Sequence, residues 1–177
     1  DVTITTGTDN IITLNGAISA AGGTSAAATA GAGGNVTFAD PVVLATGITI
    51  TTGTTAGNIA FQSTLDSEAS EDNTLGLTAG TGNITFTGAV GGATNGELGG
   101  VTIVSAANVT ASSTIEAASL TQSAGTGTTM LDGLVTTTAA GTNVNLTTAS
   151  IDIDASVVTN GGAVDLNATT LVDLATG

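Results

Sequence analysis

The sequence of 177 residues contains no Lys, Arg or His, whereas it contains 14 Asp and Glu, which gives a formal net charge of −14. Without cationic side chains, a protein cannot release counterions from a phosphate backbone or bind an anionic membrane surface, so the composition argues against nucleic acid and membrane partners. It also lacks the imidazole and amine that serve as proton shuttle, Ser–His base or Schiff-base nitrogen. We therefore do not expect an enzyme.

Cys, Trp and Tyr are absent as well. The lack of Cys excludes disulfides and thiol chemistry. No run of 18 apolar residues occurs, so we expect no membrane-spanning helix. The absence of Lys and Arg removes every trypsin-type cleavage site, which suits an extracellular or cell-surface protein. The sequence begins at Asp1 with neither a Met nor a leader, and we interpret it as a processed product or an excised piece.

Hydrophobic residues make up 41% of the chain, but the only aromatic ones are Phe38, Phe61 and Phe86. A core must therefore consist mainly of Val, Ile, Leu and Ala. Abundant Thr and Val favour strands, and 26 Gly supply tight turns. This richness in β-branched residues argues against disorder. The length fits a single domain, residues 1–177, or one segment of a longer repeat protein.

A short motif recurs along the chain, in which Gly-Asn precedes a stretch of alternating apolar and polar residues. Its clearest copies are residues 34–38, 57–61 and 82–86; weaker ones are 9–13, 107–111, 127–131, 142–146 and 162–166. The Asn residues at positions 10, 35, 58, 83 and 108 are separated by 25, 23, 25 and 25 residues. Internal repetition with a period of this size is typical of solenoid proteins.

Alternation within the motif predicts strands with one inward face. The residues expected to point inward are Val36, Phe38, Ile59, Phe61, Ile84 and Phe86. Further strand-like pieces lie between the Asn positions, at residues 47–51, 75–78 and 101–104. Residues 63–74 are acidic, have Leu65 as their only large apolar side chain, and are predicted to form a loop.

We therefore predict an all-β fold: a parallel β-helix, or β-solenoid, of roughly seven or eight coils of 20–25 residues. At about 4.8 Å per coil, the solenoid would be on the order of 35–40 Å long. The Phe residues should stack as an internal column. The Asn residues should stack at a corner, where Asn tolerates the left-handed backbone and its amide can bond the next coil. The alternative is an antiparallel β-sandwich, which would show hairpins between consecutive strands.

The repeated Gly-Asn-Ile-Thr-Phe phrase and the Leu-Thr-Ala-Gly-Thr-Gly-Asn stretch at residues 77–83 resemble the repeats of large bacterial surface proteins. These are the filamentous-haemagglutinin-like adhesins and related β-strand-repeat proteins, and the resemblance covers residues 9–174. It implies a right-handed parallel β-helix, export to the cell surface, and a role as a stalk, fibre or adhesin without catalytic residues.

Carboxylates are the main candidate ligands for a metal, and they suit Ca²⁺. The densest cluster is Asp66, Glu68, Glu71 and Asp72, and a second candidate is the pair Asp152 and Asp154, on one strand face around Ile153. Asp165 and Asp173 could stack near that pair on later coils. The alternative interpretation is a solvated acidic surface. A melting temperature that falls by several degrees on adding EGTA would indicate a structural ion.

Three further interpretations have some support in the sequence. Paired carboxylates can cleave glycosides, although the chain lacks the basic residue and the free aromatics that such sites use. Threonine-rich stretches at residues 3–5 and 49–51 are similar to the Thr arrays of ice-binding solenoids, although Thr also favours outward strand positions by propensity. Asn-X-Thr glycosylation acceptors occur at Asn35, Asn83, Asn108, Asn145 and Asn167.

The two ends of the chain are expected to be uncovered. Strand-like sequence begins at residues 2–5 and continues to residues 171–174, and neither end carries an amphipathic helix, a Lys or a Pro that would guard an open strand edge. The sequence therefore predicts a partner at each end: another copy of the chain in a head-to-tail filament, or flanking repeats of the same chain. A structural role in an extracellular fibre, sheath or adhesin stalk follows.

Overall fold

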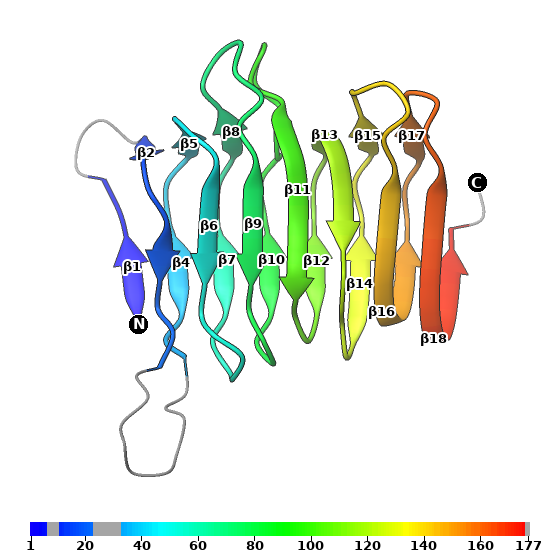
Figure 1. The fold of residues 1–177 in the computed structure, drawn as a ribbon, viewed down its shortest axis with the longest axis horizontal. Coiled ribbons are helices and arrows are strands. Elements are labelled where there is room, and N and C mark those ends of the chain that lie inside the picture. The colour runs from blue at the N-terminus through cyan, green and yellow to red at the C-terminus, as the bar shows by residue number, and fades with distance from the viewer. Residues whose placement is uncertain (7–10, 23–32, 176–177) are drawn as a thin grey trace.

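The computed structural model describes residues 1–6, 11–22 and 33–175, and all 18 elements assigned in these residues are β-strands. The strands lie side by side along the long axis of the molecule, from β1 at the N-terminal end to β18 at the C-terminal end (Figure 1). Every ladder between these strands is parallel. The fold is thus the predicted β-solenoid, and the antiparallel sandwich is excluded.

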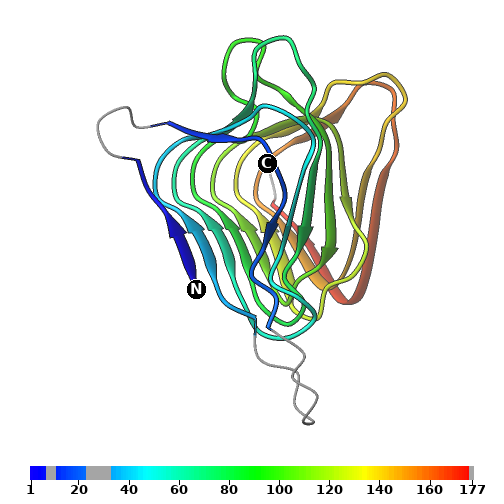
Figure 2. The same ribbon diagram turned by 60° about the vertical axis from the view of Figure 1, so that its left-hand side comes forward.

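Strands line three faces around a common interior (Figure 2). The first face contains the strands that begin with the repeated motif. In stacking order these are β1 (Val2–Ile4), β4 (Val36–Phe38), β7 (Ile59–Phe61), β10 (Ile84–Phe86), β12 (Val109–Ala111), β14 (Thr128–Leu131) and the later parts of β16 (Val144–Ile153) and β18 (Val164–Leu174).

The other two faces alternate with the first along the chain. The second face consists of β2 (Ile12–Leu14), β5 (Val42–Leu44), β8 (Leu65–Ser67), the bridge residue Val90, the start of β13 (Ile115–Gln122), β15 (Val135–Thr137) and β17 (Val157–Thr159). The third consists of β3 (Ile18–Ser19), β6 (Ile48–Thr51), β9 (Leu75–Thr78), β11 (Leu98–Ser105), the end of β13 and the starts of β16 and β18.

The solenoid makes about six turns, slightly fewer than the seven or eight predicted. The turns are unequal in length. The first takes 34 residues, as the hydrogen bond from Asn35 to Asp1 shows. Later turns take between 20 and 25 residues.

The predicted inward side chains form the core. All six, namely Val36, Phe38, Ile59, Phe61, Ile84 and Phe86, are at most 2% exposed. The Phe column is confirmed as well: the ring centroids of Phe38 and Phe61 lie 4.8 Å apart, and those of Phe61 and Phe86 lie 5.4 Å apart, with nearly parallel planes. Because strands pair in register, like residues meet on successive coils and stack in this way.

The Asn ladder at the corner before the first face is also confirmed. The side-chain oxygen of Asn35 accepts the backbone N–H of Asn58 at 2.7 Å, and Asn58 accepts from Asn83 at 2.8 Å. The side-chain oxygen of Asn83 accepts the backbone N–H of Asn108 at 3.2 Å, and the ladder ends where Asn108 accepts the N–H of Thr128 at 2.8 Å. Each Asn thus satisfies a backbone donor of the next coil at a corner, where strand pairing stops.

The prediction of a left-handed backbone for the ladder Asn residues was wrong. Among the described residues, the non-glycine residues with positive φ are Ser70 and Asn95, neither of which belongs to the ladder. The position requires only a side-chain acceptor. Asp1 shows this, because its carboxylate accepts the N–H of Asn35 at 2.8 Å.

The repeat implies that every copy of the motif lies on the first face, but only some of the weaker copies do. The copy at 127–131 belongs to the first face, since β14 pairs with β12. The copies at 142–146 and 162–166 start β16 and β18 on the third face, where Asn143 accepts the N–H of Ala163 at 2.9 Å. Asn10, in the upstream copy, lies outside the described residues, and the strand that follows begins with Ile12, which pairs with Val42 on the second face.

The loop predicted for residues 63–74 is only partly correct. Residues 65–67 form strand β8, which pairs in parallel with β5. Leu65 is fully buried and packs its side chain against the core, and Asp66 and Ser67 of the same strand are buried as well. The rest of the segment forms a loop that protrudes from the solenoid beside β8 (Figure 1).

The glycines that precede the ladder residues allow neighbouring coils to approach closely. A Cβ at Gly82 would lie 2.0 Å from the carbonyl oxygen of Gly57 on the coil before, and a Cβ at Gly57 would lie 3.0 Å from the carbonyl oxygen of Gly33 on its own preceding coil. These distances leave no room for a methyl group, which explains why Gly precedes Asn in the motif.

We predict that Gly82→Ala lowers the free energy of unfolding by about 1–3 kcal/mol, because the new methyl group forces two coils apart at the corner. Gly16→Ala is the control, since a Cβ there meets nothing within 4 Å. Urea unfolding followed by circular dichroism measures both. Equal stability of the two variants would contradict the close approach of the coils.

Candidate functional site

The ends of the solenoid carry unpaired strand edges. At the N-terminal end, β1 pairs only with β4, β2 only with β5, and β3 only with β6. At the C-terminal end, β17 pairs only with β15, and β18 only with β16. Among residues 1–6, 11–22 and 33–175, no strand covers the other edge of these five. The prediction of uncovered ends therefore holds for the described residues.

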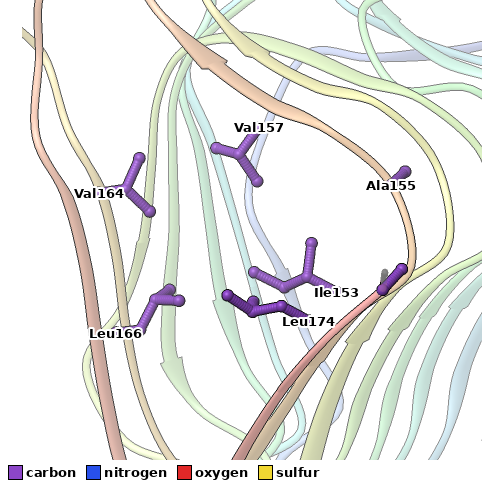
Figure 3. A pocket seen from close by; sticks show the side chains of 7 residues that line it. Ile153, Ala155, Val157, Val164, Leu166 and Leu174 are labelled. Atoms are coloured by element: carbon purple, nitrogen blue, oxygen red, sulfur yellow. The ribbon is translucent and has the colours of Figure 1, made fainter. Parts of the chain in front are cut away.

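The C-terminal end also exposes the interior of the solenoid. A hollow of about 290 Å³ lies there, with walls made almost entirely of aliphatic side chains (Figure 3). Its lining consists of Ile153, Ala155, Val157, Val164, Leu166, Leu174 and Ala175. On the coil before, the core residues Ile151 and Ile153 are 0% and 5% exposed, whereas Leu174 is 56% exposed. The last coil thus presents core positions to solvent.

The side chains of this hollow come from all three faces. Val157 enters from β17 on the second face, and Leu166 from β18 on the third. Leu174 lies near the end of β18 on the first face, stacked on Ile153. Figure 3 shows these side chains directed into one shared space. This grouping at one end differs from the singly scattered apolar side chains of an ordinary protein surface.

At the N-terminal end, the inward positions are better covered. Ile12 and Leu14 are 6% and 7% exposed, and Val2, Ile4 and Ile18 are half-buried. The outward positions of the same three strands carry hydroxyl groups, namely Thr3, Thr13 and Ser19, all exposed. The sequence predicted open ends but gave no sign of this asymmetry between them.

The first group of candidate metal ligands does not converge on a common point. Asp66 lies in β8 and is 9% exposed, and one carboxylate oxygen accepts the N–H of Ala93 at 2.9 Å. Glu71 accepts from the side-chain amide of Asn73 at 3.1 Å, while Glu68 is exposed in the loop after β8. Asp72 is exposed there as well. In the part of the chain that the structure describes, no three acidic side chains are grouped as a metal site.

The second group lies near the C-terminal end. Asp152 is half-buried in β16 and stacks on Asp173 of β18, as predicted. Asp154 follows β16 and is exposed. Asp165 is not part of this group, because it stacks on Asn145 on the third face.

One further carboxylate belongs to the second group and was missed in the sequence. Asp132 contributes to the electrostatics of Asp152 from the preceding coil. Leu131, beside it, pairs with Ile153 and accepts the N–H of Asp154 at 3.0 Å. A spacing of about one coil length between acidic residues is the signal that would have identified Asp132.

This clustering changes the ionisation of one side chain. Partial burial raises the pKa of Asp152 above its ordinary value of 3.8, and neighbouring negative charges raise it further. These charges belong to Asp154, Asp173 and Asp132. No cation of the chain compensates them, because the sequence contains no Lys, Arg or His. At neutral pH the ionised group therefore works against folding.

The Thr stretches do not form an unbroken array. The outward column of the first face reads Thr3, Thr37, Ala60, Thr85, Thr110 and Met130. On the third face, Gly76 separates Thr49 from Thr102. Three of the Asn-X-Thr acceptors, Asn35, Asn83 and Asn108, use their side-chain oxygens in the ladder.

Two other findings bear on function. The described residues include no helix of the length and apolarity needed to cross a bilayer. Comparison of the chain with protein-family models, curated proteins and solved structures found no match. Functional inference therefore rests on the geometry of the two ends.

We predict that the melting temperature rises as the pH is lowered from 7 through the raised pKa of Asp152 towards 3.8. The folded state binds the proton more readily than the unfolded state, so protonation removes a cost that is present at neutral pH. Asp152→Asn should melt at a higher temperature than the wild type at pH 7 and show a smaller rise on acidification. The measurement is thermal unfolding across this pH range.

Asp165→Asn is the matched control for this prediction, because it removes the same charge on another face. If the two variants had identical pH profiles, the effect would come from net charge alone, and the specific role of the Asp152 cluster would be disproved.

Proposed function

We propose that the chain is a structural segment of an extracellular fibre, sheath or adhesin stalk, extended by end-to-end stacking of solenoid coils. The observation that carries this proposal is the C-terminal end, where unpaired strand edges surround an exposed apolar interior. An uncovered coil of this kind loses backbone hydrogen bonds and leaves its core in water, and the natural way to restore both is another coil.

The chemistry of the side chains supports a structural role over an enzymatic one. The chain offers no imidazole, amine, thiol or phenol to a substrate. Its described carboxylates form no group of three suited to a metal. Calcium binding remains an alternative proposal that no contact in the described residues favours.

Placement outside the cell rests on two features of the sequence. A chain without Lys or Arg contains no site for trypsin-type proteases. Its Gly-Asn repeats also resemble those of bacterial surface adhesins, in which long solenoids form stalks. A negative charge of one sign along the rod opposes side-by-side aggregation and leaves the ends as the preferred points of contact.

The proposal allows two sources for the covering coil: a second copy of this chain, or flanking repeats in the same polypeptide. Both continue the same parallel ladders, so both give a longer rod of the same width. The two differ in whether the 177-residue chain assembles by itself.

We predict that the purified chain forms unbranched filaments one solenoid wide, whose mean length increases with protein concentration. Negative-stain electron microscopy measures length and width. Raising the salt concentration should increase lateral bundling by screening the surface charge, while end-to-end contacts persist because they rest on backbone pairing and apolar burial. Discrete rods of single-chain length at every concentration would contradict self-assembly.

A further inference from the structure

We propose that a hollow on the side of the solenoid binds the ammonium group of a Lys side chain from a partner protein, with Asp66 as its counter-ion. The hollow lies on the outer side of the second face, where the loops of residues 68–74 and 91–97 protrude next to each other (Figure 1). Because it is formed by the side of the solenoid, this site is independent of the proposed stacking at the ends.

Hydrogen bonds hold the two loops against each other. The N–H of Ser70 donates to the carbonyl of Asn95 at 2.9 Å, and the N–H of Ser67 donates to the carbonyl of Gly96 at 2.9 Å. Ser70 and Asn95 are the two non-glycine residues with positive φ in the part of the chain that the structure describes, at 67° and 55°. Such a backbone conformation costs energy and persists where surrounding contacts fix it. The contacts between the loops therefore define the shape of the hollow.

Asp66 supplies a carboxylate to this hollow. It points outward from β8, beside Val43 of β5, but it is only 9% exposed because residues 91–97 cover it. One carboxylate oxygen accepts the N–H of Ala93 at 2.9 Å. The other accepts no hydrogen bond from the described residues, and no polar side-chain atom among them is both enclosed and unpaired. The free oxygen therefore opens into the hollow, which Asp66 lines.

The chain provides no counter-ion for this carboxylate. A carboxylate with little contact to water is stabilised by a nearby cation, whereas the 177 residues contain no Lys, Arg or His. The cation must therefore come from another molecule, and a second copy of these residues cannot supply a Lys side chain. Glu68, which also lines the hollow and is exposed, adds a second negative charge at its rim.

The walls of the hollow suit an aliphatic stem. The volume is about 390 Å³, and the lining is mainly apolar, including Pro41, Val43, Ala69 and Ala93. A Lys side chain buries its four methylene groups along such a surface and places its ammonium group on a polar partner. The ammonium group carries three N–H donors, and Thr64 and Thr94, which also line the hollow, offer hydroxyl acceptors besides Asp66.

The same geometry disfavours two other cations. Arg binds a carboxylate best through two parallel hydrogen bonds, one to each oxygen, but one oxygen of Asp66 is already bonded to Ala93. Calcium takes six to eight oxygen ligands, and no three acidic side chains of the described residues are grouped around a common point. An ammonium group needs one free carboxylate oxygen, which Asp66 has.

Titration of the ¹⁵N-labelled chain with n-butylammonium chloride tests the site by nuclear magnetic resonance. The amide of Ala93 is the reporter, because it donates to Asp66. We expect its resonance to shift in a saturable manner, with a dissociation constant on the order of 1 mM because the ligand is small. The peptide acetyl-Gly-Lys-Gly-amide should bind at least as tightly. Ammonium chloride, calcium chloride and n-butanol should give no saturable shift.

Two variants separate the charge from the shape of the hollow. Asp66→Asn keeps an oxygen for the N–H of Ala93 but removes the charge, and it should weaken butylammonium binding by more than about tenfold. Ala69→Trp keeps the charge and fills the hollow from its exposed rim, so it should abolish binding. Asp165→Asn is the matched control, because it removes the same charge on the third face, and it should bind as the wild type does.

Equal affinity of Asp66→Asn and the wild type would overturn the proposed site. Equal responses to butylammonium and ammonium chloride at the same ionic strength would do so as well, because they would show general attraction to an acidic surface. Saturable binding of calcium without butylammonium binding would replace the proposal with a metal site. Binding of butylammonium but not of the peptide would disprove the protein partner and indicate a free amine. Filament formation is measured separately by electron microscopy, so failure here leaves the proposed function intact.

Discussion

Parallel backbone pairing between successive coils is the interaction on which the rest of this structure depends. A single turn of 20 to 25 residues cannot cover its own apolar face or satisfy its own strand edges, and it becomes stable only between two neighbours. The repeated sequence features serve this contact. Glycine at positions 57 and 82 lets the coils approach, Asn58 and Asn83 bond the donors at the corner, and the Phe residues stack because pairing is in register.

The same dependence gives the ends their importance. An interior coil has a neighbour on each side, whereas the last coil exposes Leu174 and the edge of β18. Because the chain carries charge of one sign, contacts between acidic surfaces of two molecules are unfavourable. The proposed role in a fibre rests on these two features, a surface charge that opposes lateral contact and an end whose strand edges are unpaired.

The sequence was sufficient to predict the fold and the core, because both follow from local periodicity. The alternation in Val36-Thr37-Phe38 identifies the inward residues without any knowledge of the rest of the chain. It could not assign each copy of the motif to a face, because the face is decided by the summed length of all the turns before it. Asn143 therefore bonds Ala163 on the third face although it resembles Asn35. For the same reason the proximity of Asp132 to Asp152 and the shape of the C-terminal hollow became visible only once the register was known.

Amide hydrogen exchange at the two ends of a dilute and an assembled sample tests the central claim most directly. In strand β18 the amides of Val172 and Leu174 point to the open end, whereas the amide of Ala175 donates to Ile153 at 2.8 Å. The account predicts fast exchange at Val172 and Leu174 in the dilute chain and strong protection after assembly, with Ala175 and the interior strand β10 little changed. If Val172 and Leu174 were equally protected in both samples, or remained unprotected within filaments, coil-on-coil pairing at the C-terminal end would be contradicted.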